Sequence, residues 1–398
     1  MNVAIVLGTR PEAIKLSPVI NTLKESGFNV KVIATGQHHE LIMHVFEFFR
    51  IEADFLHCMK QDLLENTACM AISLKEIFQK YKPDCVIVQG DTLSCYMGAY
   101  TAFLSKIPVL HVEAGLRTYD KFSPFPEEMF RKLTDELSDV FFAPTRRAVE
   151  NLFREGFPKD RIVLTGNTVV DAIYMAQRYL DRAKIKKELE KLIEKDISSF
   201  EGIVFITSHR RENIGEPMKN IRDAVNELAP KYPHLLFIWS LHKNPFVRKS
   251  ILEDFTKLPD NLAIVEPLTY PQIVYIMESS VIIISDSGGI QEEACTLKKP
   301  LLITRNVSER MEVVDVGLGK VVGTRKENII KEFESIYRNT EFYRNIIFEN
   351  PFGDGRASER IKKFLLCEDV RDFILNYEKK YKLNLFKCAK ANSVNDEN

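Results

Sequence analysis

Short apolar, β-branched runs alternate with helix-prone segments along most of the chain, and this alternation constrains the fold more than any other feature. Strand-like runs lie first at residues 3–7, 30–34, 85–89, 109–112 and 140–143, with helical patterns at 11–25 and 41–49. Strands and helices that alternate at this spacing predict parallel β-α-β units. We therefore predict an α/β protein with doubly wound, Rossmann-like sheets.

The same pattern restarts after Gly166. A charged helix is expected at about 181–195, and further strands at 203–207, 235–240, 262–265, 281–285, 301–304 and 320–322. At 398 residues the chain is long for one hydrophobic core, so we expect two domains. Ligands of such sheets bind at the carboxyl ends of the strands, so two facing domains would hold a ligand in the cleft between them.

Charge and composition argue against several classes of protein. The 55 basic and 56 acidic residues nearly cancel, so no nucleic-acid partner is expected. No apolar run approaches the roughly 20 residues of a membrane helix. The N-terminus enters a strand-like run at once, without the basic start and cleavage site of a signal peptide. The seven scattered cysteines include no Cys-x-x-Cys pair and predict free thiols in a reducing cytoplasm rather than disulfides or a zinc site.

The segment 281–294 carries the strongest ligand signal. Its apolar strand stops at Asp286, Ser287, Gly288 and Gly289, and a helix-prone stretch follows. A helix N-terminus offers N–H groups and a partial positive charge to a phosphate, and glycines let it approach closely. An acidic residue behind the turn would bind a ribose diol. The segment indicates a nucleoside diphosphate site, although many similar junctions bind nothing.

A second cationic turn lies near the N-terminus. Gly8 ends the first strand, and Arg10 and Lys15 place two cations beside the start of the next helix, which suits a phosphate. An ordinary turn with solvated charges is the alternative, and on this segment alone it is slightly favoured.

Carboxylates follow two other predicted strands. Asp91 follows the strand 85–89, and Glu113 follows the strand 109–112. Glu127 lies in a proline-rich loop soon after. Several carboxylates at one sheet edge suit acid/base chemistry. Asp91 alone would more often be a helix N-cap, and His111 would more often be a packed core residue than a catalyst.

The second half has its own polar cluster, 207–213. His209 and Arg210 follow an apolar strand and suit a diphosphate clamp, because preorganised donors stabilise a departing anion by several kcal/mol. A salt-bridged surface turn is the alternative. A similar cluster, 305–310, follows the strand 301–304. The chain lacks metal-ligand spacing, a P-loop, and a dinucleotide fingerprint after its first strand, so a nucleotide hydrolase or a nicotinamide enzyme is not expected.

Taken in this order, the clusters resemble the motifs of the non-hydrolysing UDP-N-acetylglucosamine 2-epimerases. The matching segments are 8–15, 36–38, 89–92, 111–118, 126–128, 165–168, 209–213, 286–293 and 308–310. The resemblance covers about residues 1–361. It implies the two-domain glycosyltransferase-B fold, a homodimer, and no metal or redox cofactor. It also implies domains at 1–166 plus a helix at about 358–380, and at 167–357, with a polar tail at 381–398.

The resemblance also implies a reaction. UDP is eliminated from C1 while the C2 proton is removed, a glycal is left, and UDP adds back after reprotonation on the opposite face. Catalytic roles are implied for Asp91, Glu113, Glu127 and His209, with base and acid unassigned. Contacts to UDP and sugar are implied for nine residues: Arg10, Lys15, Arg131, Arg210, Ser287, Gly288, Gly289, Glu293 and Arg310. The product would supply surface polysaccharide synthesis in the cytoplasm.

The chain departs from the family pattern at a few positions. Phe130 stands where the family usually has asparagine, Ile273 where an aromatic residue often frames the uracil, and Asn306 where aspartate is usual. Gln37 and His38 match a regulatory substrate site, but the arginine of its second motif is missing from 59–62. These departures leave the regulation and the sugar open.

Three alternatives remain open at this point. A hydrolysing relative would release free N-acetylmannosamine and UDP. A glycosyltransferase of the same fold would not need the set Asp91, Glu113 and Glu127. A non-catalytic nucleotide-sugar sensor is the third alternative, and the intact set of carboxylates and clamp residues counts against it.

Overall fold

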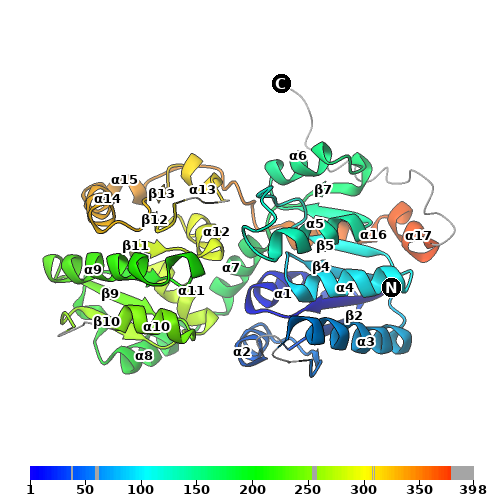
Figure 1. Cartoon of the computed structure of the whole chain (residues 1–398), viewed down its shortest axis with the longest axis horizontal. Coiled ribbons are helices and arrows are strands. Elements are labelled where there is room, and N and C mark those ends of the chain that lie inside the picture. The colour runs from blue at the N-terminus through cyan, green and yellow to red at the C-terminus, as the bar shows by residue number, and fades with distance from the viewer. Residues whose placement is uncertain (37–38, 59–61, 253–257, 307, 309, 378–398) are drawn as a thin grey trace. The chain divides into compact units, whose positions relative to one another are not determined.

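Two parallel β-sheets organise the chain, each in its own unit. The computed structural model describes residues 1–36, 39–58, 62–252, 258–306, 308 and 310–377 (Figure 1). Unit 1 comprises Met1–Met175 together with the segment from Phe352 onward, and unit 2 comprises Ala176–Pro351. The change of unit falls inside one helix, α7 (Thr168–Tyr179).

Within the described residues, unit 1 holds a seven-stranded sheet in the order β3-β2-β1-β4-β5-β6-β7, with every pair parallel. Its strands are β1 (Asn2–Leu7), β2 (Asn29–Ala34), β3 (Asp54–Phe55), β4 (Cys85–Gln89), β5 (Val109–Val112), β6 (Val140–Ala143) and β7 (Ile162–Leu164). Its helices are α1 (Arg10–Glu25), α2 (His39–Phe49), α3 (Leu63–Tyr81), α4 (Leu93–Leu104), α5 (Glu127–Leu137), α6 (Arg146–Arg154), the 3₁₀ turn η1 (Lys159–Arg161), α16 (Ala357–Leu366) and α17 (Glu368–Leu375).

Unit 2 holds, in its described part, a six-stranded parallel sheet in the order β10-β9-β8-β11-β12-β13. Its strands are β8 (Gly202–Thr207), β9 (Leu235–Ser240), β10 (Leu262–Val265), β11 (Ser280–Ser285), β12 (Leu301–Ile303) and β13 (Gly319–Val321). Its helices are α8 (Arg182–Ile193), η2 (Ile197–Ser199), η3 (Arg211–Asn213), α9 (Glu216–Lys231), α10 (Pro245–Leu252), α11 (Tyr270–Ser279), α12 (Gly288–Thr296), α13 (Glu312–Asp315), α14 (Lys326–Arg338) and α15 (Thr340–Arg344).

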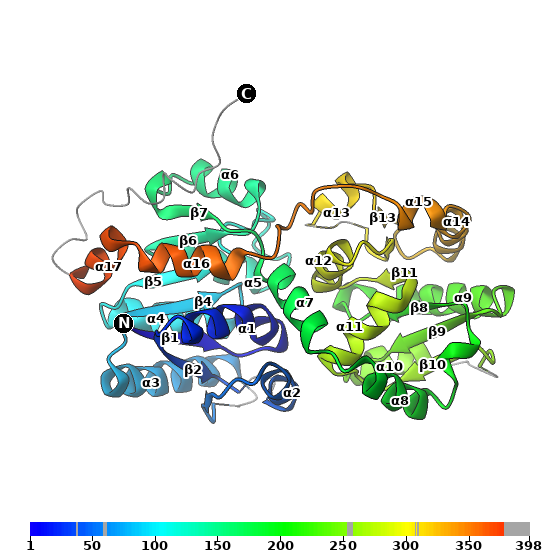
Figure 2. The same ribbon diagram turned by 180° about the vertical axis from the view of Figure 1, so that it is seen from behind.

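The predicted α/β class is confirmed, with one Rossmann-like sheet in each unit. Helices cover both faces of the unit 1 sheet: α3, α4 and α5 in the view of Figure 1, and α1 and α16 in the view of Figure 2. Residues 3–7 of the interior strand β1 are accordingly fully buried. A sheet buried on both faces explains why its strands read as continuous apolar runs rather than as alternating patterns.

The last helices return to unit 1. The N-terminus of α16 is capped by Asp171 of α7, whose carboxylate accepts hydrogen bonds from Ala357 N (3.1 Å), Ser358 N (2.8 Å) and Ser358 Oγ (2.6 Å). The carboxylate satisfies helix N–H groups that have no partner within the helix. Arg360 adds a bond to the Thr165 carbonyl at 2.9 Å. As a result, α16 packs beside α1 (Figure 2).

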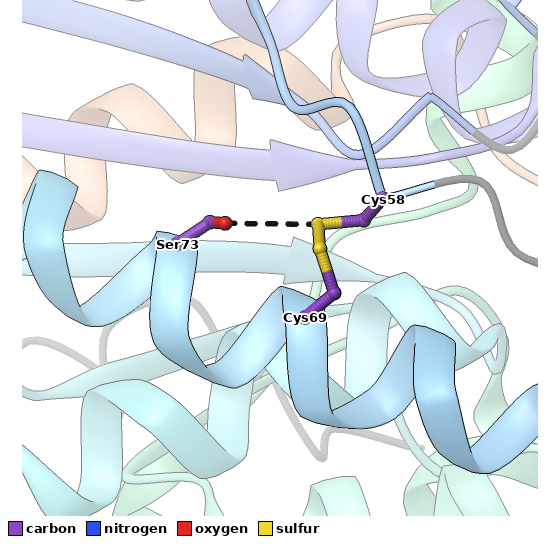
Figure 3. The surroundings of a disulfide bond; sticks show 3 residues. All are labelled: Cys58, Cys69 and Ser73. Carbon is purple, nitrogen blue, oxygen red and sulfur yellow. Dashed lines mark hydrogen bonds between the residues drawn. A yellow bond between two sulfur atoms is a disulfide. The ribbon is translucent and has the colours of Figure 1, made fainter.

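The prediction of free cysteines is wrong for Cys58, Cys69 and Cys367, each of which is disulfide-bonded. Cys58, in the segment after β3, forms a disulfide with Cys69 of α3, and Ser73 lies 3.6 Å from the Cys58 sulfur (Figure 3). The two residues are 11 apart in sequence, but the fold brings their Cα atoms to 5.5 Å, within bonding range. Cys85, Cys95 and Cys295 are free, as expected. One argument for a reducing compartment is therefore weakened.

Two short strands, β3 and β7, were not expected from the sequence. β3 has two residues and β7 three, so neither provides a run long enough to recognise. Among the described residues, no helix combines the length and hydropathy needed to cross a bilayer.

Candidate active site

The strand order of each sheet reverses direction at one point, and the sequence clusters lie there. In unit 1 the reversal lies between β1 and β4, and in unit 2 between β8 and β11. Neighbouring crossovers leave opposite faces of the sheet at such a point, which opens a crevice at the carboxyl ends of the strands. Arg10 and Asp91 follow β1 and β4, and His209 and Ser287 follow β8 and β11. Each unit therefore presents a candidate site at its switch point.

Glu113, immediately after β5, is buried against a lysine. Lys15 Nζ lies 2.7 Å and 2.8 Å from its two carboxylate oxygens, and both side chains are less than a tenth exposed. Gln89, the last residue of β4, donates its amide to the same carboxylate. Lys15 is thus an ion-pair partner of a predicted catalytic carboxylate. This contact links α1, β4 and β5.

The backbone at Glu113 is also unusual. Its φ is 68°, in the left-handed region that a residue with a Cβ rarely adopts. The bond from Glu113 N to the Phe142 carbonyl, at 3.0 Å, fixes this conformation, and Gly115 follows with φ 84°. Such backbone strain persists only where the surroundings over-determine it, and it is concentrated at functional sites.

Asp91 lies in the loop between β4 and α4 and is held by an arginine. The guanidinium of Arg131, from α5, donates to the Asp91 carboxylate and also lies 3.4 Å from Glu128. Arg131 is buried, whereas the Asp91 side chain keeps 29% of its surface exposed. Asp91 is not the N-cap of α4, because Thr92 occupies that position and accepts from Cys95 N. Asp91 is therefore a positioned carboxylate that remains accessible.

The two glutamates at the start of α5 differ. Glu127 is the first residue of the helix and is partly exposed. Glu128 is buried and accepts from the backbone N–H groups of Thr118, at 3.1 Å, and Tyr119, at 2.9 Å. Glu128 thus shapes the loop before α5, a role that the sequence did not indicate. Arg10 opens α1 at the switch point and is partly buried.

Glu12 is a buried carboxylate that joins the two turns at the switch point. Its Oε2 accepts from Gly8 N (2.9 Å), Thr9 N (2.7 Å) and Thr9 Oγ1 (2.8 Å), and its Oε1 accepts from Thr92 Oγ1 (2.6 Å). Burial raises its pKa to about 7, although these hydrogen bonds oppose the shift. Glu12 therefore ties the turn that carries Arg10 to the turn that carries Asp91.

The Glu12 pKa predicts a pH-dependent stability. Because the folded pKa of about 7 exceeds the ordinary 4.5, the stabilising contribution of protonated Glu12 is complete below pH 4.5 and is lost as the pH rises to about 7. Relative to Glu12→Gln, the unfolding free energy of the wild type should fall by roughly 3 kcal/mol across this window and then level off. Urea unfolding of both proteins between pH 4 and about 8.5 measures the difference.

A matched control is Glu25→Gln, at the exposed end of the same helix. Its profile should run parallel to that of the wild type. Parallel profiles for the Glu12 variant as well would contradict the assigned pKa.

In unit 2 the buried Asp286 organises the corresponding switch point. Its carboxylate accepts from Ser208 Oγ (2.6 Å), from the backbone N–H groups of His209 and Arg210 (both 3.0 Å) and from Asn213 Nδ2 (2.9 Å). Strand ends pair directly here, with Ser285 opposite Thr207. Asp286 thus holds the turn after β8 against the turn after β11.

His209 faces the same edge with its ring partly exposed. Its Nδ1 lies 3.5 Å from an Asp286 oxygen, and the ring stacks on His242 with centroids 5.3 Å apart. About a third of the side chain remains accessible. A histidine oriented by a buried carboxylate can donate a hydrogen bond to an anion.

The glycine turn after β11 begins helix α12, as predicted. Ser287 is the N-cap, and Gly288 and Gly289 are the first helical residues. A Cβ on Gly288 would lie 2.7 Å from the Arg310 guanidinium, whereas the space beside Gly289 is open to 4 Å. Arg310 is fixed by Glu292, whose carboxylate accepts from its Nε at 2.7 Å. The turn therefore combines a helix N-terminus with an oriented cation, a setting suited to a phosphate.

Glu293, a predicted binding residue, is buried in α12. It directly follows Glu292, the partner of Arg310. Gln37 and His38 fall outside the described residues. Among the residues that are described, no group of three or more His, Cys, Asp or Glu side chains is arranged to bind a metal ion.

Together the two switch points offer different chemistry. Unit 1 gathers Asp91 and Glu113 with their cations, which suits proton transfer. Unit 2 gathers His209, Arg310 and a helix N-terminus, which suits a diphosphate.

Known proteins are similar to this chain in sequence and in fold. A family model described as UDP-N-acetylglucosamine 2-epimerase matches residues 21–366. The UDP-N-acetylglucosamine 2-epimerase of Neisseria meningitidis is 45% identical over 371 residues, which cover 92% of this chain and 99% of that protein.

Solved structures of such epimerases have a similar fold. A crystal structure of the Neisseria meningitidis UDP-GlcNAc 2-epimerase bound to UDP-GlcNAc has a TM-score of 0.85 at 45% identity, covering 92% of this chain and 100% of that one. The Methanocaldococcus jannaschii UDP-GlcNAc 2-epimerase in complex with UDP-GlcNAc and UDP has a TM-score of 0.78 at 35% identity, with 92% and 99% covered. The chain therefore belongs to the UDP-N-acetylglucosamine 2-epimerase family.

Proposed function

We propose that the protein catalyses the reversible C2 epimerisation of UDP-N-acetylglucosamine to UDP-N-acetylmannosamine. Unit 2 binds the UDP group, and unit 1 supplies the carboxylates that act on the sugar. The observation that carries the proposal is the pair Asp91 and Glu113, each fixed by its own cation at the carboxyl edge of the unit 1 sheet. A glycosyltransferase or a nucleotide-sugar sensor has no need for such a pair.

The reaction follows from the acidity of the substrate. The C2 proton of a sugar is poorly acidic, so cleavage of the C1–oxygen bond must run ahead of its removal. UDP leaves with the bonding electrons, a unit 1 carboxylate accepts the C2 proton, and a C1–C2 double bond forms as 2-acetamidoglucal. UDP then adds back to C1 after a proton is delivered to the opposite face of C2. His209, Arg310 and the α12 N-terminus stabilise the negative charge on departing UDP.

Removal and return of the proton occur on opposite faces of C2, so the reaction needs at least two placed proton carriers, or one carrier and a conformational shift. Asp91, Glu113 and Glu127 are the proposed carriers. Structures of related epimerases bound to UDP-GlcNAc, or to UDP-GlcNAc and UDP, support the substrate class. The proposed binding set is completed by eight residues: Arg10, Lys15, Arg131, Arg210, Ser287, Gly288, Gly289 and Glu293. We further propose that the enzyme works without a metal or redox cofactor and supplies surface polysaccharide synthesis in the cytoplasm, where sugar nucleotides are made.

Product analysis tests the proposal directly. Incubation with UDP-N-acetylglucosamine should give a mixture with UDP-N-acetylmannosamine, seen by proton NMR as a second anomeric signal that stays coupled to phosphorus. Free N-acetylmannosamine with UDP would show a hydrolysing enzyme instead. If only another UDP-2-acetamido sugar is converted, the assigned sugar is wrong while the reaction class stands.

We also propose that the protein is a homodimer, with α3, α4 and α5 as its contact face. These helices lie side by side on unit 1 (Figure 1) and expose eight large apolar side chains: Leu63, Leu64, Ile72, Tyr100, Phe103, Leu104, Met129 and Leu133. Helix α4 carries no charged residue. In a two-fold interface residues near the axis meet their own copies, so an uncharged helix avoids like-charge repulsion.

Light scattering coupled to gel filtration checks the contact face. Phe103→Arg should shift the mass from dimer to monomer. Phe153→Arg, at an exposed position on α6, should leave the dimer intact. A dimeric Phe103→Arg protein would place the contact elsewhere.

A further inference from the structure

A buried histidine bridges α5 to the loop that carries Asp91. His111 lies on β5 with only 1% of its surface exposed. Its Nδ1 is 2.6 Å from Asp135 Oδ1, and its Nε2 is 2.8 Å from the carbonyl oxygen of Gly90. Gly90 directly precedes Asp91. The core position expected for His111 is correct, but the ring is also a hydrogen-bonded connection.

Both partners of the ring are acceptors. Burial would raise the pKa of Asp135, but His111 and Arg117 outweigh it and hold that pKa below its ordinary value, so the group is a carboxylate. A carbonyl oxygen also accepts only. The ring satisfies both contacts when both of its nitrogens carry hydrogen, as the imidazolium. The Cys95 sulfur, 3.8 Å from Nε2, is the other titratable group beside that nitrogen.

The surrounding charges suit an imidazolium. Asp135 Oδ2 lies 2.8 Å from the Arg117 guanidinium, which in turn binds Glu155 at 2.6 Å. Charges therefore alternate in sign along the contacts from Glu155 through Arg117 and Asp135 to His111. They sum to zero when the ring is charged. Burying an unpaired charge would cost several kcal/mol, and this alternation leaves none.

The same carboxylate reaches the second catalytic loop. Asp135 Oδ2 accepts from Gly115 N at 3.2 Å, two residues after Glu113. Gly90 and Gly115 both have positive φ, 79° and 84°, so their loops are tight turns set by specific contacts. One turn earlier on α5, Arg131 holds Asp91 itself. Helix α5 thus fixes both carboxylate-bearing loops through Arg131 and Asp135.

We propose that His111, held by Asp135, is a positioning residue that sets the place of Asp91 through the Gly90 carbonyl. It transfers no proton to the substrate. Its kinetic consequence rests on the proposed function, whereas its hydrogen bonding does not. A displacement of about 1 Å at a reacting group can cost about 100-fold in rate, so losing this contact should lower kcat more than it changes KM.

A matched pair of variants separates the two contacts of the ring. In His111→Asn the side-chain amide lies near the place of Nδ1, which keeps a donor for Asp135 and loses the bond to Gly90. In His111→Gln the amide reaches the place of Nε2, which keeps a donor for Gly90 and loses Asp135. Both variants bury a neutral amide in place of the ring, so a purely structural role would affect them alike.

We expect kcat to fall by about 100-fold in His111→Asn and by less than about 10-fold in His111→Gln, with KM little changed in either. The rate is measured as consumption of UDP-N-acetylglucosamine, whichever product forms. Equal losses in both variants, or the larger loss in His111→Gln, would overturn the proposal. Thermal unfolding of each variant shows whether it is folded at the assay temperature.

A second measurement uses the wild-type protein and does not depend on its activity. It therefore tests the proposal even if the variants fail to fold or the protein lacks epimerase activity. Histidine-labelled wild-type protein should show, in nitrogen–proton NMR, a His111 Nε2 that carries a hydrogen-bonded proton. An Nε2 without hydrogen would overturn the proposal even if epimerase activity is present. If this proton is observed and no turnover of any UDP-sugar is found, the proposed function fails and the bridge stands.

Discussion

Asp91→Asn should lower kcat by at least about 1000-fold while UDP still binds, because a positioned general base or acid contributes roughly 10²–10⁴ in rate. The amide keeps the shape of the carboxylate and an oxygen that Arg131 can still bond. It cannot accept the C2 proton. UDP binding is proposed for unit 2, and Asp91 lies in unit 1. Steady-state kinetics and calorimetric titration with UDP measure the two effects separately.

The control for this variant is Asp260→Asn, an exposed aspartate of unit 2. It should leave both kcat and UDP affinity unchanged. Wild-type kcat in Asp91→Asn would remove Asp91 from the catalytic set. Loss of UDP affinity in that variant would show that unit 1 contributes to nucleotide binding.

Lys15→Met should have the largest effect on stability. It removes the cation that lies 2.7 Å from the buried Glu113 carboxylate, while the amide of Gln89 still donates to that carboxylate. Removing one partner of a buried ion pair costs about 3–5 kcal/mol, because the remaining charge loses its counter-charge. Glu113 would also lose the cation that holds its carboxylate in place, so we expect turnover to be lost. Denaturant unfolding gives the free energy, and the epimerase assay gives the rate.

A double variant shows whether the cost arises from the pair. Lys15→Met combined with Glu113→Gln removes both charges, so it should recover most of the stability while remaining inactive. Lys24→Met, at an exposed position of the same helix, controls for the loss of a lysine. Additive losses in the double variant would mean that Lys15 and Glu113 do not compensate one another.

Much of the fold followed from the sequence, because parallel strands buried on both faces leave uninterrupted apolar runs. β4, β5, β6, β9 and β10 have the predicted bounds. The placement of Asp91 and Glu113 at one sheet edge followed as well, since they come after the neighbouring parallel strands β4 and β5. The partners Arg131 and Lys15 required the structure, because their helices reach that edge from distant parts of the chain.

The sequence could not distinguish Glu127 from Glu128. They are adjacent in a proline-rich turn, and only the start and orientation of α5 decide which is buried. Glu12 read as part of a cationic turn, although its carboxylate binds two separate turns. The disulfide was missed for a similar reason. A spacing of 11 residues has no pairing signal until the fold brings the segment after β3 beside α3.

Solvent deuterium incorporation at C2 tests the central claim most directly. The protein is incubated with UDP-N-acetylglucosamine in heavy water, and the nucleotide sugars are analysed by NMR and mass spectrometry. The account predicts UDP-N-acetylmannosamine that carries one deuterium at C2, because the proton removed by a unit 1 carboxylate is replaced from solvent. UDP-N-acetylmannosamine without deuterium, free sugar as the sole product, or no exchange at all would contradict it.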